Sequence, residues 1–386
     1  MSYKINIDSV NLEMKVPASK SVLHRVLIVN FLLQSLKGAP SKEVIDLITT
    51  PLDIDNQDII ATRGCLKALY EASKTNSDER VVMPCNESGS TLRFMISVGI
   101  ACLNFKGLAN THKLVFKPKG RLINRPLDQL IDCLKEHGVS VVIDKEAEEI
   151  IVSGVMSEGD YKIEGNVSSQ YISGLLMASV VMKNSRVVLV GKLESSGYVD
   201  LTLDSLKFKG IEVSIDPIEN DNKAYTLNLP NNVEDITSIE AESDWSSAAF
   251  LLSLAAVSPK AHMVLGGLNK DSKQKDKIIV DIINQMGVKT SWENRNGEEV
   301  IVVDTDKLGD GIGKLTLDTK DYPDIVPYIA VLAAALTEET VFENVGRLKF
   351  KESDRVKATM DVLSCAAIPC SENVEAESFT VVGKRS

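Results

Sequence analysis

The chain alternates two kinds of predicted helix, and this repeat restricts its possible folds more than any other feature. Helices of the first kind open with small polar or charged residues and then become almost wholly apolar. Such a pattern predicts a helix that is buried on most sides and presents its N-terminus to something polar. The pattern occurs in five segments, at residues 19–33, 88–101, 168–182, 243–257 and 321–336.

Helices of the second kind are amphipathic and usually end at a glycine that leads into a strand. Gly138, Gly210 and Gly287 follow such helices, and we expect them to be left-handed C-caps before alternating strands. Related amphipathic helices begin near Asn56 and Asp354. The helix pairs therefore start near residues 20, 88, 168, 244 and 321, a period of roughly 70–80 residues.

The repeat predicts five units, each with a buried helix, an amphipathic helix and their strands. A chain of 386 residues is too long for one ordinary core, so we expect two domains. Two domains built by doubling would need six units. Residues 377–386 read as the strand after the fifth amphipathic helix, so we expect the sixth unit to be absent.

Composition excludes several classes of function. A net charge of -11 and an aromatic content of 5% argue against binding to nucleic acid. Residues 1–16 alternate like a strand rather than a signal peptide, and no apolar segment is long enough to span a bilayer. The six cysteines form no C-x-x-C pair and the four histidines no ligand spacing, which predicts a cytoplasmic protein without a metal.

The first buried helix opens with cations. Lys20, Ser21 and Arg25 cluster at its start, and Ser21 and Arg25 share one helix face. Free backbone N–H groups beside Lys and Arg suit a phosphate or a carboxylate. The alternative is an N-cap serine with solvated cations.

The second buried helix and the segment after it carry a glycine and three arginines. Gly89 allows a ligand to approach the backbone, and Arg93 lies one turn into an apolar helix, where it needs an anionic partner. Arg121 and Arg125 precede an amphipathic helix, where a cation opposes the helix dipole, so anion binding explains them better. For Arg93 a structural partner is the alternative.

Three later helix starts also carry polar groups. The first has adjacent Ser168, Ser169 and Gln170, which can hold a phosphate and hydroxyls, although ordinary capping explains them almost as well. Asp324 opens the fifth buried helix, where pairing with the helix dipole is the alternative. The last amphipathic helix begins near Lys351, Glu352 and Arg355, which otherwise would form only a surface salt-bridge network.

Taken in order, these segments resemble the enolpyruvyl transferases, and within them the 5-enolpyruvylshikimate-3-phosphate synthase family. The resemblance runs from about residue 12 to 360 and rests on PASKSVLHR, NESGSTLRF, GRLINRP, NVSSQY, SDWSSAA, YPD and KFKESDR. It implies an α/β fold, the two-domain inverse αβ barrel of repeated βαβαββ units, with five of six units present and helix N-termini facing an interdomain cleft. The domains implied are residues 16–238, with three units, and residues 1–15 with 239–386, with two.

The resemblance also implies a reaction. The family transfers the enolpyruvyl group of phosphoenolpyruvate to the 5-hydroxyl of shikimate 3-phosphate and releases phosphate, without a metal or organic cofactor. The expected partners are these two small molecules, with no nucleic acid and no membrane, and the expected state is a monomer.

By resemblance, Asp324 is the base that takes the hydroxyl proton, Glu352 is the acid that protonates the methylene carbon, and Lys20 lies between the substrates. The residues implied for shikimate 3-phosphate are Lys20, Ser21, Arg25, Ser168, Ser169, Gln170, Ser195, Asp324 and Lys351. The residues implied for phosphoenolpyruvate are Lys20, Gly89, Arg121, Gln170 and Arg355.

The sequence departs from the family pattern in places. An Asp-His-Arg motif and a later Lys motif of the phosphoenolpyruvate site do not occur, and the loss of two cations should cost several kcal/mol of anion binding. Glu87 and Arg347 stand where other members carry Asn. The alternatives are an inactive, truncated shikimate-3-phosphate binder and, less favoured, the transferase that acts on UDP-N-acetylglucosamine, whose Lys-Asn start and loop Cys are not found.

Overall fold

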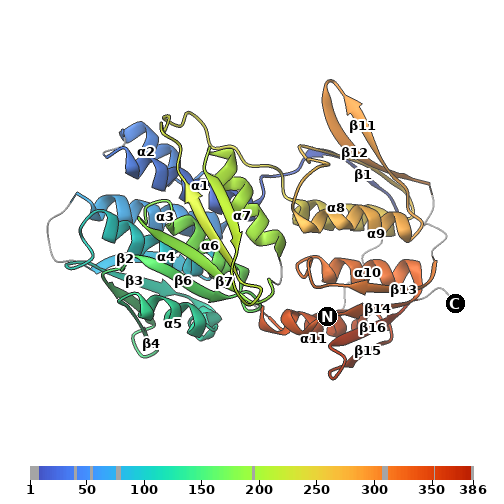
Figure 1. The fold of residues 1–386 in the computed structure, drawn as a ribbon. Coiled ribbons are helices and arrows are strands. Elements are labelled where there is room, and N and C mark those ends of the chain that lie inside the picture. The colour runs from blue at the N-terminus through green and yellow to red at the C-terminus, as the bar shows by residue number, and fades with distance from the viewer. Residues whose placement is uncertain are drawn as a thin grey trace. The chain divides into compact units, whose positions relative to one another are not determined.

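The computed structural model describes residues 8–38, 41–52, 55–74, 80–193, 196–306, 312–351 and 353–383. The chain divides into two compact units (Figure 1). We call Lys20–Ala241 the inserted unit, and Met1–Ser19 with Glu242–Ser386 the terminal unit. Each unit has an apolar core of its own.

The inserted unit contains two four-stranded sheets among its described residues, with strand orders β2-β3-β5-β4 and β6-β7-β9-β8. Its strands are β2 (Arg80–Asn86), β3 (Lys113–Pro118), β4 (Val139–Asp144), β5 (Glu149–Gly154), β6 (Gly159–Glu164), β7 (Ser185–Val190), β8 (Glu212–Pro217) and β9 (Lys223–Asn228). Its α-helices are α1 (Lys20–Leu36), α2 (Lys42–Thr49), α3 (Gln57–Ala72), α4 (Gly89–Phe105), α5 (Asp128–Glu136), α6 (Ser169–Ala178) and α7 (Ser196–Phe208).

The described part of the terminal unit repeats this topology in the orders β1-β10-β12-β11 and β13-β14-β16-β15. Its strands are β1 (Val10–Lys15), β10 (Ala261–Gly266), β11 (Thr290–Arg295), β12 (Glu298–Thr305), β13 (Ile312–Asp318), β14 (Thr337–Glu343), β15 (Cys370–Asn373) and β16 (Ser378–Val382). Its α-helices are α8 (Trp245–Val257), α9 (Ile279–Gln285), α10 (Val326–Leu336) and α11 (Arg355–Cys365), and α8 and α10 lie side by side between the two sheets (Figure 1).

The four sheets of the described residues share one pattern of strand pairing. The first strand pairs in parallel with the second, the second pairs antiparallel with the fourth, and the fourth pairs antiparallel with the third. Because parallel neighbours need a crossover, a mostly buried helix joins the first two strands, and an amphipathic helix leads into the last two. This arrangement is the βαβαββ unit that the resemblance implies. In the first terminal-unit sheet, the whole inserted unit lies between β1 and α8 in sequence.

The expected left-handed C-caps are confirmed. Gly138, Gly210 and Gly287 have φ values of 83°, 75° and 88°. In the corresponding place after α11 the chain has Ala367, with φ 56°. The hydrogen bonds are the same there, because Ile368 N donates to Leu363 O at 3.0 Å as Ile211 N donates to Leu206 O at 3.0 Å. Ala367 therefore bears steric strain that a glycine would avoid.

The repeat departs from expectation in its first unit. Between residues 20 and 74 the described residues contain no strand, and the strand beside this helix pair is β2, which follows α3 and packs against it. The chain forms α2 instead, capped by Ser41, whose hydroxyl accepts from Val44 N at 3.3 Å. The cause is visible in the sequence, because the apolar side chains Val44, Ile45 and Ile48 recur at helical spacing and are buried.

A buried ion pair attaches this segment to α3. Arg63 Nε donates to Asp55 Oδ2 at 2.7 Å, and both side chains are almost fully buried. The Arg63 guanidinium also donates to Leu47 O at 3.0 Å and to Ile48 O at 2.7 Å, the last carbonyls of α2. The Arg63 guanidinium therefore supplies hydrogen-bond donors to carbonyl groups at the C-terminus of α2, which have no partners within the helix.

Four cysteines, Cys65, Cys85, Cys102 and Cys133, are buried free thiols, whereas Cys365 is exposed and Cys370 half-buried. In the described residues no helix is both long and apolar enough to cross a bilayer. The same residues contain no group of three or more His, Cys, Asp or Glu side chains placed to bind a metal ion.

Replacing Ala367 with glycine should stabilise the protein. The left-handed conformation costs a non-glycine residue roughly 1–2 kcal/mol, and glycine removes this cost. Glycine also makes the unfolded chain more flexible, which offsets part of the stabilisation. We expect a net increase of about 1 kcal/mol in the free energy of unfolding, measured by urea denaturation. The matched control is Ala366→Gly, at the preceding C-cap, where the backbone has φ -89° and no such gain is expected.

Replacing Arg63 with methionine should leave the Asp55 carboxylate buried without its partner. Such a change costs about 3–5 kcal/mol in other proteins. The exposed pair Lys270–Glu299, with atoms 2.6 Å apart, is the control, and Lys270→Met should change stability by less than about 1 kcal/mol. If both variants lose the same free energy of unfolding in urea denaturation, the buried Arg63–Asp55 pair does not stabilise the attachment of α2.

Candidate active site

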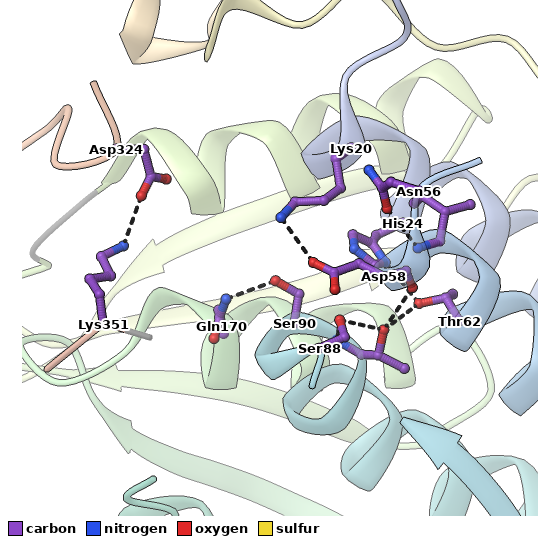
Figure 2. Close-up of polar contacts among 12 residues, drawn as sticks. Lys20, His24, Asn56, Asp58, Thr62, Ser88, Ser90, Gln170, Asp324 and Lys351 are labelled. Atoms are coloured by element: carbon purple, nitrogen blue, oxygen red, sulfur yellow. Dashed lines mark hydrogen bonds and ion pairs between the residues drawn. The ribbon is translucent and has the colours of Figure 1, made fainter. Parts of the chain in front are cut away.

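A chain of buried hydroxyls brings helix starts together in the inserted unit. His24 Nδ1 in α1 lies 2.8 Å from Thr62 Oγ1 in α3, which lies 2.8 Å from Thr91 Oγ1 in α4. Thr91 Oγ1 also lies 2.8 Å from Ser88 Oγ, the N-cap of α4 (Figure 2). Because these bonds involve the first two turns of three helices, they hold three N-termini at one end of the unit.

Lys20, predicted to lie between the substrates, pairs with a carboxylate. Its Nζ lies 2.9 Å from Oδ2 of Asp58, in the first turn of α3 (Figure 2). Burial, then the charges of Lys20 and Arg25, lowers the pKa of His24 well below its ordinary value. His24 is therefore neutral, and the positive charge at this helix start belongs to Lys20 and Arg25. Asp58 was not predicted as a site residue, although an Asp in the first turn after a helix-capping Asn is a usable signal.

The N-terminus of α4 carries two guanidinium groups. A Cβ added to Gly89 would lie 2.4 Å from Arg125 Nη1 and 3.4 Å from Arg93 Nη1. Arg93 Nη1 donates to Gln170 Oε1 at 2.7 Å. Gln170 Nε2 donates to Ser90 Oγ at 2.9 Å (Figure 2). Glycine, two guanidiniums and a helix N-terminus together create a positive potential that suits an anion.

Arg25, a predicted substrate ligand, is buried and makes hydrogen bonds within the inserted unit. Its side chain is 2% exposed, and its Nε donates to Thr202 Oγ1 at 2.7 Å. Its Nη2 donates to Tyr198 O at 2.9 Å, and its Nη1 donates to Ser21 O at 2.5 Å. Burial lowers the pKa of Arg25 to about 10, so it remains a cation that joins α1 to α7.

The other predicted residues of this unit lie at helix starts. Ser168 is the N-cap residue of α6 but makes no side-chain capping bond, so ordinary capping does not account for its hydroxyl. Ser169 is buried and Ser21 half-buried. Arg121 is exposed in a 3₁₀ turn, Gly120–Asn124. The Glu87 carboxylate lies over Gly120, 3.1 Å from where a Cβ would be.

In the terminal unit, the Asp324 carboxylate contacts two cationic side chains. Arg355 Nη1, at the start of α11, donates to Asp324 Oδ1 at 2.5 Å. Lys351 Nζ lies 3.3 Å from the same oxygen (Figure 2). The predicted base and two predicted anion-binding cations are therefore in contact. All three side chains are 23–30% exposed, so solvent and ligands can reach them.

A second carboxyl group accompanies Asp324 and was not identified from the sequence. Asp276 is buried and accepts a hydrogen bond from Ser246 Oγ, in the first turn of α8. Burial, then the negative charge of Asp324, raises the pKa of Asp276 to about 7. In the sequence this residue stands in a run of Lys and Gln with no distinguishing pattern, so only the structure identifies it.

Two predicted site residues, Ser195 and Glu352, lie outside the described residues. Their assignments as a substrate ligand and as the general acid stay predictions.

Comparison with known proteins gives a consistent result. A family model for EPSP synthase (3-phosphoshikimate 1-carboxyvinyltransferase) matches residues 5–376. The 3-phosphoshikimate 1-carboxyvinyltransferase of Clostridium beijerinckii is 32% identical over 372 residues, covering 91% of this chain and 78% of the relative. The protein of the same name from Brachyspira hyodysenteriae is 33% identical, with 90% and 77% covered.

Solved structures show the same fold. The EPSP synthase of Acinetobacter baumannii superposes with a TM-score of 0.64 at 19% identity, over 98% of this chain and 82% of that one. The enolpyruvyl transferase NikO of Streptomyces tendae gives a TM-score of 0.58 at 10% identity, over 97% and 82%. The mixed α/β fold implied by the resemblance is thereby confirmed as that of the enolpyruvyl transferases. The chain belongs to the EPSP synthase family.

Proposed function

We propose that this protein transfers the enolpyruvyl group of phosphoenolpyruvate to the 5-hydroxyl of shikimate 3-phosphate and releases phosphate. Family membership supports the reaction. The observation that carries the proposal at the site is that carboxylates and cations meet at helix N-termini in both units, as Lys20–Asp58 and as Asp324–Arg355. Two polyanionic substrates need such positive sites, and the transferred proton needs a base.

For phosphoenolpyruvate, the proposed anion site lies at the N-terminus of α4. Gly89 leaves the backbone open, and Arg125 and Arg93 lie beside it. Arg121, in the turn just before Arg125, and Arg355 of the terminal unit supply further charge in this proposal. Gln170 is oriented by Arg93 and Ser90 and offers its amide to either substrate.

For shikimate 3-phosphate, the proposed ligands are Ser168, Ser169 and Lys351, together with Lys20 and Ser21. Arg25 contributes its positive charge from a buried position and supports Ser21 by donating to its carbonyl at 2.5 Å. Ser195 stays in the proposal on family resemblance alone.

The proposed base, Asp324, is held by Arg355 and Lys351 before substrates arrive. Because substrate phosphate and carboxylate groups attract the same two cations, their binding would release Asp324 to accept the hydroxyl proton. Lys20 would exchange Asp58 for a substrate anion in the same way. Glu352, one residue beyond Lys351, is the proposed acid that protonates the methylene carbon of phosphoenolpyruvate.

The reaction requires both units to act on one pair of substrates, so we propose that each unit serves as a domain of the enzyme. A single chain supplies every proposed group, which favours a monomer. Four buried cysteines persist as free thiols, which suits the reducing cytoplasm.

Phosphate release by the purified protein tests the function. We expect release only when both substrates are present, and Asp324→Asn should lower kcat by at least about 100-fold because the base is lost. The control Asp361→Asn, an exposed carboxyl on α11, should retain full turnover. If shikimate 3-phosphate binds but no phosphate appears, the protein is a binder rather than an enzyme.

Gly89→Ala should selectively weaken the binding of phosphoenolpyruvate. The new methyl group would lie 2.4 Å from Arg125 Nη1, so this guanidinium must move, while the backbone need not. Losing one charge-assisted hydrogen bond should raise KM for phosphoenolpyruvate about tenfold or more, with little change in melting temperature. Gly313→Ala is the control, since the nearest atom to its Cβ would be 3.7 Å away. An unchanged KM would place phosphoenolpyruvate elsewhere.

A further inference from the structure

Asp276 is held in position by its neighbours. It lies in a 3₁₀ turn, Lys275–Ile278, just before α9, and its side chain is 6% exposed. The preceding Gln274 accepts from Ser19 Oγ at 3.0 Å and from Trp245 N at 3.2 Å, and donates to Ser243 O at 2.8 Å. These bonds fix the turn against the start of α8, so the Asp276 carboxyl has little freedom to move.

The starts of α8 and α10 lie close to each other. Phe250, in the second turn of α8, and Tyr328, in the first turn of α10, have ring centroids 5.6 Å apart. Asp276 accepts its hydrogen bond from Ser246 at the start of α8, and Asp324 lies two residues before the first residue of α10. The two carboxyl groups thus belong to adjacent helix starts.

Charged groups of both signs act on Asp276. Asp324 and Asp244, the N-cap of α8, contribute two negative charges, and Lys351 a positive one. Arg355 adds a second cation through its bond to Asp324. An ionised Asp276 would add a third carboxylate charge beside Asp324 and Asp244, and this charge would be buried.

We propose that Asp276 is a positioning residue that holds a proton beside Asp324, so that Lys351 and Arg355 keep their positive potential for an anionic substrate. The proposal rests on the function proposed above and deepens it. Loss of the Asp276 proton adds a buried negative charge, which pulls both cations inward and repels phosphate and carboxylate groups. Substrate affinity should therefore fall as pH rises through neutrality, since burial and Asp324 raise the pKa of Asp276 to about 7.

Asp276→Asn tests this directly, because asparagine is always neutral and keeps an oxygen that accepts from Ser246. The measured quantity is the KM for shikimate 3-phosphate of the unaltered protein divided by that of the variant. This ratio should rise about five- to tenfold from pH 6 to pH 8. The substrate phosphate titrates equally in both assays, so the ratio of KM values isolates Asp276. Asp281→Asn, an exposed carboxyl on α9, should leave the profile unchanged. A KM ratio independent of pH would overturn the proposal.

Carbon-13 NMR of labelled aspartate carboxyls provides a readout that needs no turnover. One titration near pH 7 should vanish in Asp276→Asn, move to lower pH in Asp324→Asn, and move to higher pH in Ser246→Ala, which removes the bond that favours the charged form. A midpoint near the ordinary aspartate value, or one that Asp324→Asn does not move, would refute the proposal. A protein that shows these shifts without releasing phosphate would refute only the proposed function.

Discussion

The structure depends on how the N-termini of its buried helices are satisfied. A helix leaves its first backbone N–H groups without partners, and inside a protein these groups must be met by side chains, water or ligands. In α4 the Ser88 hydroxyl accepts from Thr91 N at 3.1 Å, and in α8 Asp244 accepts from Ser247 N at 3.0 Å. Polar residues therefore gather at one end of each helix, while the rest is apolar and forms the core. The proposed site is built from that polar end.

The same constraint explains why charges are paired in the structure described here. A lysine or arginine at a helix N-terminus opposes the dipole, and it is tolerated when a carboxylate or a ligand compensates it. Asp58 compensates Lys20, and Asp324 compensates Arg355. Each pair is only partly exposed, so it holds its side chains in place without sealing them from an anion that binds more strongly. Structural pairing and proposed substrate binding are two uses of one arrangement.

The local elements could be predicted from the sequence because their signals are local. The apolar runs of α1, α4, α6, α8 and α10 and the glycine C-caps all appear in the structure. Between α1 and α3 the described residues contain a helix, α2, and no strand, because the apolar side chains around Ile45 recur at helical spacing. Ala367 was also unexpected, since a left-handed C-cap is recognised in a sequence only when it is glycine.

The sequence by itself determined which segments are buried helices and which residues stand at their starts, since periodicity records burial along a single element. It also singled out Lys20, Gly89, Gln170 and Asp324 without showing what each touches. Only the tertiary structure decided that Arg125 packs on Gly89, that Arg25 is enclosed by α7, and that Asp276 accompanies Asp324. The physical reason is that these contacts, and the desolvation they cause, join residues far apart in the sequence. Arg355 and Asp324 are 31 positions apart, and Arg25 and Thr202 are 177 apart. No local sequence pattern encodes such partners.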